Sequence, residues 1–182
     1  MHPVDIKSTL DSMTILCDTR EQDTPKLRQR LEAMGHPYER VALPSGDYSA
    51  AFTLPDGSAY SLAGRVCVER KMSLDEICGN YTRGRGRFQR EFQRMADSGG
   101  KLHIIVENGS WEKVLGGEYR SQLPPTALSA SLLAWEARYG SHLHFCKPET
   151  TGKLIVKILY YEMKEILERG ELDEHGTILI RG

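Results

Sequence analysis

The sequence predicts a single α/β domain with a mixed central sheet flanked by helices. Short apolar runs typical of buried strands, above all Met13–Asp18 and Leu102–Glu107, alternate with longer amphipathic segments of helical periodicity. Glycine and proline separate these segments, and the sequence has no internal repeat and no interdomain linker. Such alternation builds a sheet with helices on its faces. We expect one domain over residues 1–182, with its core at about 13–170 between a short N-terminal lead and a C-terminal tail.

Turn and cap residues set the element boundaries in the first half of the chain. Thr24 is the expected N-cap and Pro25 the first residue of a helix that continues to about Met34. The turn Pro55-Asp56-Gly57 predicts a hairpin. The strands expected here are Tyr38–Leu43, Gly46–Phe52, Arg65–Lys71 and the hairpin arms Tyr48–Leu54 and Ser58–Leu62.

Capping and periodicity define the second half in the same way. Ser73 and Glu76 form a capping box for a short helix through about Cys78. Phe88, Phe92 and Met95 recur at helical spacing before Asp97. The remaining predictions are a helical turn at Ser110–Leu115, a helix that Pro124-Pro125 opens and that runs to about Tyr139, a helix over Thr150–Arg169, and strands at His142–Cys146 and Thr177–Ile180.

Composition excludes several classes of protein. No apolar run approaches the roughly 20 residues that span a bilayer, and the N-terminus has no apolar signal core, so we expect no membrane association and a cytoplasmic protein. Four separated cysteines argue against a disulfide framework or a zinc ribbon. The absence of a phosphate-binding loop predicts no nucleotide cofactor.

The distribution of charge is more informative than its sum. The net charge of -1 argues mildly against a non-specific nucleic-acid binder. However, the sequence concentrates five arginines in one short segment with only Glu91 opposing them, namely Arg83, Arg85, Arg87, Arg90 and Arg94. A phosphate-contacting loop is therefore favoured here over a disordered Arg-Gly tract.

The candidate catalytic and metal-ligating residues lie at the ends of the expected strands. Asp18 and Glu21 bracket the end of the first strand, Asp47 follows a glycine, and Glu69 and Lys71 share one face of a third strand because side chains alternate. Two or three carboxylates supply hard oxygen ligands for Mg²⁺ or Mn²⁺, and a lysine can orient or deprotonate water. Taken alone, an acid and a lysine two residues apart are more typical of a solvated strand face.

Together, three elements in order change that interpretation. They are Asp18-Thr19-Arg20-Glu21, then Gly46-Asp47, then Glu69-Arg70-Lys71-Met72-Ser73-Leu74-Asp75, followed by Gly86-Arg87-Phe88 with Arg94 and by the strand Ile104–Glu107. Over about residues 13–150 this pattern resembles the XPF-type nuclease domain, the family of the xeroderma pigmentosum group F flap and junction endonucleases. The resemblance implies a restriction-endonuclease-like fold and cleavage of DNA that depends on a divalent metal, Mg²⁺ or Mn²⁺, in repair or recombination.

The resemblance also implies a role for each matching residue. Asp18, Asp47 and Glu69 would hold metal, with Glu21 beside them, and Lys71 would be the catalytic lysine at the rim of the site. Arg70 and Asp75 would support the site, and Arg20 would brace the acids. Arg83, Arg85, Arg87 and Arg94 would contact DNA phosphates, whereas Glu91, where the family often has glutamine, would weaken phosphate binding there.

Several alternatives stay open at this stage. The chain could be a pseudo-nuclease, a non-catalytic DNA-binding or scaffolding module that acts with a partner. Only residues 171–182 follow the last helix, too few for the helix-hairpin-helix modules of junction-cutting relatives, so we expect a stand-alone nuclease domain of bacterial, archaeal or viral origin. The wide apolar stripe of that helix, with Leu154, Ile155, Ile158, Leu159 and Met163, fits either burial against the sheet or a homodimer surface.

Two smaller features also have competing interpretations. His142, His144 and Cys146 alternate on one strand and could ligate a metal, although a semi-exposed strand face explains them more simply. Trp111 and Trp135 could stack on bases, but Trp135 shares a helix with Leu128 and Leu132 and is better explained as a core residue.

Overall fold

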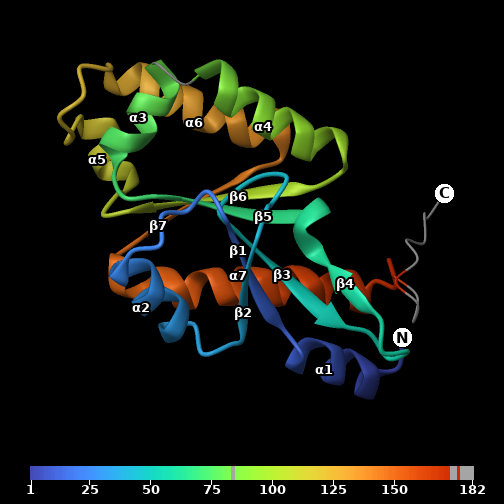
Figure 1. Cartoon of the computed structure of the whole chain (residues 1–182). Helices are drawn as coiled ribbons and strands as arrows, with labels where there is room; N and C mark the ends of the chain where they lie inside the picture. Colours follow the sequence, from blue (N-terminus) through green and yellow to red (C-terminus); the bar gives the residue numbers. More distant parts are fainter. Residues whose placement is uncertain (83–84, 173–175, 177–182) are drawn as a thin grey trace. The chain divides into compact units, whose positions relative to one another are not determined.

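The chain folds as a mixed α/β protein, as the sequence predicts. The computed structural model in Figure 1 describes residues 1–82, 85–172 and 176, without the side chains of residues 85 and 87. The chain forms two compact units. The first contains Met1–Pro44, Tyr48–Ala63 and Gly152–Gly182, and the second contains Ser45–Asp47 and Gly64–Thr151.

The first unit carries a sheet with strands in both directions. Its strands are β1 (Thr14–Asp18), β2 (Tyr38–Val41), β3 (Tyr48–Thr53) and β4 (Ala59–Ser61). β1 pairs in parallel with β2 and antiparallel with β3, and β3 pairs antiparallel with β4, which confirms the predicted hairpin. Helix α2 (Pro25–Ala33) starts at the predicted N-cap, where the Thr24 hydroxyl accepts a bond from the Leu27 N–H.

The short N-terminal lead contains the helix α1 (Pro3–Asp11), which the sequence did not predict. The His2 side chain caps it, and Pro3 occupies the first turn, where a missing N–H costs nothing. Leu10 and Thr9 are buried, and the hydroxyl of Ser12 accepts a bond from the Thr53 N–H of β3.

The second unit carries a parallel sheet in the order β5-β6-β7, made of β5 (Val66–Lys71), β6 (Lys101–Glu107) and β7 (His142–Cys146). Its helices are α3 (Leu74–Thr82), α4 (Arg85–Asp97), α5 (Trp111–Gly116) and α6 (Pro125–Tyr139), of which α3 runs one turn beyond the predicted end. These helices lie on one face of the sheet (Figure 1). Parallel strands end at a common edge, and here that edge carries Lys71 and Glu107.

Aromatic packing fixes α4 and α6 over this sheet. Trp135 on α6 is 3% exposed, and its ring lies 5.2 Å from that of Phe88 and 5.3 Å from that of Phe92 on α4. Trp135 is therefore a core residue, as its helical position predicts. Trp111 is partly buried, with its ring edge-on to that of Phe145.

The last helix, α7 (Pro148–Glu168), packs its apolar stripe against other parts of the chain. Its buried aliphatic residues are Ile155, Ile158, Leu159, Met163, Ile166 and Leu167, whereas Tyr161 is exposed. This burial favours intrachain packing as the reason for the wide stripe. Among the described residues, no helix is long and apolar enough to cross a membrane. The strand predicted at Thr177–Ile180 lies outside the described residues.

Three histidines from β6 and β7 meet in the second unit. The ring nitrogens His103 Nδ1 and His144 Nε2 lie 3.0 Å apart in nearly coplanar rings, and the ring of His103 stacks on that of His142. The sequence alone offered no reason to group His103 with the other two. Cys146 instead contacts the Thr151 hydroxyl. The two facing nitrogens lie at hydrogen-bond distance, at which one of them donates and the other accepts.

This cluster predicts a specific acid sensitivity. Burial lowers the pKa of His144 to about 4, and the charges of His103 and His142 act in the same direction. In the unfolded chain the pKa of His144 is about 6.5. The stabilisation that comes from burying neutral His144 is therefore complete above pH 6.5 and is lost as the pH falls from 6.5 towards 4. We expect the free energy of unfolding in urea to fall over this range. The variant His144→Gln should show a flatter dependence, and an equal slope in both proteins would contradict the assignment.

Candidate active site

Asp47 follows a turn that only glycine can make without strain. Gly46 has φ +69°, and a Cβ there would lie 3.0 Å from both the Cys67 Cβ and the Val68 carbonyl oxygen. The Asp47 N–H donates to the Val68 carbonyl at 2.9 Å, and its Oδ2 accepts from the Arg70 N–H at 2.8 Å. The carboxylate of Asp47 is thereby fixed against β5.

Glu69 and Lys71 form a buried ion pair beside this turn. Lys71 Nζ lies 2.5 Å from Glu69 Oε1 and 3.7 Å from Glu76 Oε1, and it also lies over the ring of Phe88. Each of the paired residues is only 7% exposed. The expectation that Lys71 stands at the rim of the site is therefore wrong, because β5 runs under α3 and α4 and both cover its C-terminal end.

The pair titrates differently from two solvated groups. Burial raises the pKa of Glu69, and the neighbouring Glu91 and Glu76 raise it further, so the attraction of Lys71 offsets only part of the shift. Burial alone would lower the pKa of Lys71, but Glu69, Asp47 and Glu76 together raise it above its usual range. Lys71 is therefore held as an ammonium ion. Of the two roles considered for it, orienting water fits this state and deprotonating water does not.

Several carboxylates gather around the buried ammonium of Lys71. Four carboxylates make up this acid cluster, those of Asp47, Glu69, Glu76 and Glu91. The charges of Glu91 and Glu76 raise the pKa of Glu69, and the charges of Glu69, Asp47 and Glu76 raise that of Lys71. Burial of like charges is unfavourable unless a cation compensates them. Carboxylate oxygens are the ligands that Mg²⁺ and Mn²⁺ prefer. By this donor set, Asp47 and Glu69 fit a hard divalent cation.

Arg70 lies on the opposite face of β5. Its guanidinium donates two bonds to the Glu107 carboxylate, at 2.8 and 2.7 Å, and Glu107 also accepts from the Thr151 hydroxyl at 2.6 Å. Both residues of this fork are largely buried. Such a planar two-bond pair fixes the ends of β5 and β6 relative to each other. The predicted role of Arg70 in supporting a catalytic site stays a prediction.

Asp75 braces a loop. The hydrogen bonds that the structure describes for its carboxylate go to Arg120 and Ser121 and not to the acid cluster. Its carboxylate accepts bonds from the backbone N–H groups of Arg120 and Ser121 and from the Arg120 side chain. These bonds lower its pKa, with the Arg120 side chain as the main cause. Asp75 therefore ties the start of α3 to the segment between α5 and α6. Its predicted membership of the catalytic set stays a prediction.

Asp18 lies in the first unit and is fully engaged there. Oδ1 accepts from the N–H and Nε of Arg20, and Oδ2 accepts from Arg20 Nη2 and from the Leu43 N–H. Burial raises the pKa of Asp18, but these bonds more than offset it and keep the pKa low. Arg20 thus braces Asp18 as predicted. A metal-ligand role for Asp18 stays a prediction, and it requires that one of these bonds be given up.

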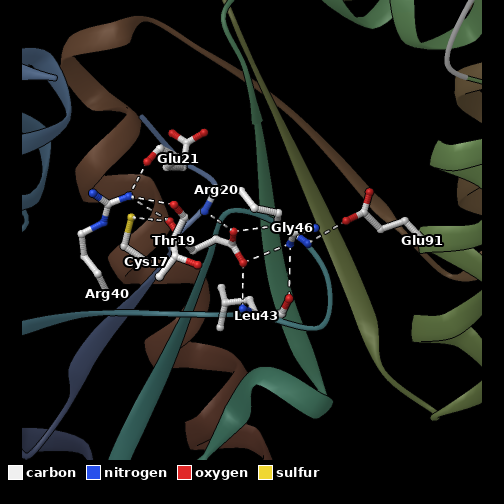
Figure 2. A network of polar contacts seen from close by, with 9 residues as sticks. Cys17, Thr19, Arg20, Glu21, Arg40, Leu43, Gly46 and Glu91 are labelled. Carbon is white, nitrogen blue, oxygen red and sulfur yellow. Dashed lines mark hydrogen bonds and ion pairs between the residues drawn. The ribbon is translucent and has the colours of Figure 1, made fainter. Parts of the chain in front are cut away.

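Glu21 contributes its backbone to the same turn. Figure 2 shows Arg40 donating to the carbonyl oxygens of Thr19 and Glu21. The side chain of Glu21 is half-buried, and its negative charge contributes to the raised pKa of Tyr48. Its predicted position beside the metal also stays a prediction.

The arginine-rich segment opens a helix, as the sequence suggests. α4 runs from Arg85 to Asp97. Arg90 and Arg94 are exposed one turn apart on this helix. Arg83 lies outside the described residues, as do the side chains of Arg85 and Arg87, so their predicted contacts with DNA stay predictions.

The family model of the ERCC4 domain matches residues 17–158, which include the whole acid cluster. The chain belongs to the ERCC4 domain family. No curated protein matches its sequence. This ERCC4 domain is similar to the solved structures of XPF from Aeropyrum pernix, with a TM-score of 0.59 and 24% identity over 81% of this chain. A second structure, of XPF from Aeropyrum pernix in complex with DNA, gives a TM-score of 0.58 and 24% identity over 84%.

These similarities confirm the predicted resemblance and the restriction-endonuclease-like fold. The ERCC4 domain described here spans 65% of the length of the matched Aeropyrum pernix chains.

The Gly46 turn provides a test of the site's construction. We expect Gly46→Ala to lower the free energy of unfolding by about 1–3 kcal/mol, because it adds backbone strain and a close contact with β5. Gly140→Ala is the matched control, since Gly140 has φ +60° but no heavy atom near a new Cβ. Urea unfolding of both variants measures the difference. Equal losses would show that the close approach at Gly46 does not constrain the turn.

Proposed function

We propose that this chain is an endonuclease that hydrolyses phosphodiester bonds in DNA with the help of a divalent cation, Mg²⁺ or Mn²⁺. The main support is the acid cluster around Lys71: the carboxylates of Glu69, Asp47 and Glu76 act on its ammonium, and the Glu69–Lys71 ion pair is buried. Carboxylates gathered in this way repel one another and a phosphate unless a cation compensates them. Asp47, Glu69 and Lys71 belong to the sequence pattern that resembles the XPF-type nuclease domain, and the ERCC4 family model covers all three positions.

Each residue then has a distinct task. Asp47 and Glu69 would hold the cation, which supplies a lowered pKa for bound water and polarisation of the phosphate. Lys71, protonated and fixed by Glu69, orients the attacking water and stabilises the negative charge that develops on the phosphate oxygens. Arg70 and Glu107 keep β5 and β6 in place, so that the Asp47 carboxylate stays on the Arg70 N–H.

DNA is the proposed substrate for two reasons. The XPF chain from Aeropyrum pernix was solved in complex with DNA and shares this fold. In addition, Arg90 and Arg94 present positive charge on α4, the helix that also carries Glu91 of the acid cluster. Branched, flap or fork DNA is the substrate class that we infer from the family pattern. A homodimer through α7 is a weaker inference, because most of the apolar residues of α7 are buried within the chain.

Substitutions at Asp47 and Lys71 test the proposed chemistry. We expect Asp47→Asn and Lys71→Ala each to lower the cleavage rate at least about a hundredfold, because each removes a charge at the reacting phosphate. The measurement is cleavage of labelled flap, fork and plain duplex DNA in Mg²⁺ and in Mn²⁺. Asp97→Asn, an exposed change at the end of α4, should cut at the wild-type rate.

Stability controls keep this test interpretable. Lys71→Ala leaves Glu69 buried without its counter-ion and should cost about 3–5 kcal/mol of stability. The double variant Glu69→Gln with Lys71→Met removes both charges, so it should recover much of that loss and still not cut. Near wild-type cleavage by Asp47→Asn would discard the mechanism. A wild-type protein that binds DNA but cuts none of the substrates would instead be the pseudo-nuclease.

A further inference from the structure

Glu91 is a buried acid on a helix otherwise rich in arginine. It is 9% exposed and lies on the inner side of α4 with Phe88 and Phe92, whereas Arg90 and Arg94 are exposed. The expected weakening of phosphate binding by Glu91 therefore loses its basis, because the carboxylate is not on the surface that carries the exposed arginines. The burial of this carboxylate must therefore be explained by contacts inside the fold.

The turn that carries Asp47 is one part of that reason. Glu91 Oε1 accepts a hydrogen bond from the Gly46 N–H at 3.2 Å, which Figure 2 shows. The next residue along the chain is Asp47, whose own N–H and carboxylate are bound to β5. Glu91 therefore links α4 to the backbone immediately before the candidate metal ligand.

The charge of Glu91 is the other part. Among the side chains that the structure describes, no lysine or arginine forms an ion pair with it. One of its ionisable neighbours is a second acid, because the negative charge of Glu91 acts on Glu69. Lys71 pairs with Glu69 and one backbone N–H binds Glu91, so these contacts compensate the two adjacent buried carboxylates only in part, whereas a divalent cation would compensate both.

We propose that Glu91 is a positioning residue of the cation site, which holds the Gly46-Asp47 turn with one oxygen and contributes its negative charge to retention of the divalent cation. This inference deepens the proposed function and rests on it only as far as a cation binds at Asp47 and Glu69. The affinity of carboxylate sites for hard cations increases with the number of charges that they present. The cation site of this chain thus has one charge more than a site with glutamine at position 91.

Mn²⁺ binding in the absence of DNA tests the proposal, with free Mn²⁺ measured by electron paramagnetic resonance. Glu91→Gln keeps an oxygen for the Gly46 N–H but removes the charge, and we expect it to weaken Mn²⁺ binding at least tenfold. Glu136→Gln is the matched control, since Glu136 also accepts a backbone N–H, that of Leu143 at 2.9 Å, in the same unit. It should bind Mn²⁺ like the wild type.

A second variant separates charge from position. Glu91→Ala removes both functions and should weaken Mn²⁺ binding at least as much as Glu91→Gln, with a lower midpoint of urea unfolding. If Glu91→Gln binds Mn²⁺ as tightly as the wild type, the proposal is overturned, because the charge then contributes nothing. This holds even if Glu91→Ala binds Mn²⁺ more weakly.

The failure of this inference and that of the proposed function are distinguishable. If the wild type binds Mn²⁺ but cuts no DNA, and Glu91→Gln binds it more weakly, the nuclease assignment fails and the role of Glu91 stands. If the wild type cuts DNA and Glu91→Gln binds Mn²⁺ equally well, the role of Glu91 fails alone. A wild-type protein without Mn²⁺ affinity overturns both.

Discussion

The buried pair of Glu69 and Lys71 is the interaction on which the site depends. Two opposite charges at 2.5 Å, each 7% exposed, are tolerable only as a pair, because either one alone would be a buried unpaired ion. The pair also sets the protonation state of the lysine, since Glu69, Asp47 and Glu76 together keep it an ammonium. The site is therefore built around the ammonium of Lys71, which the carboxylates of Glu69, Asp47 and Glu76 surround.

Backbone geometry brings the remaining acids to this pair. The turn at Gly46 approaches β5 so closely that a side chain there would collide with Cys67 and Val68. The same approach gives Asp47 its two bonds to β5 and exposes the Gly46 N–H to Glu91 of α4. A single glycine thus allows one strand, one turn and one helix to each supply a carboxylate.

Two arginines keep the neighbouring strand ends in place. Arg70 forms a fork with Glu107 across β5 and β6, and Arg20 forms one with Asp18 beyond the end of β1. In both pairs the acid is the more deeply buried partner and accepts further bonds, from Thr151 and from the Leu43 N–H respectively. These acids stabilise the framework, whereas Asp47 and Glu69 remain the best candidates for chemistry.

The sequence by itself determined the α/β class, most elements and the pattern that identifies the ERCC4 domain, because hydrophobic periodicity, caps and motif spacing are local properties. It also placed Glu69 and Lys71 on one strand face, which follows from the alternation of side chains alone. Only the tertiary structure decided that Lys71 is buried, that Asp18 is saturated by Arg20, that Glu91 turns inward and that His103 joins His144. Each of these depends on which helix or strand covers a residue, and that contact comes from segments distant in the chain.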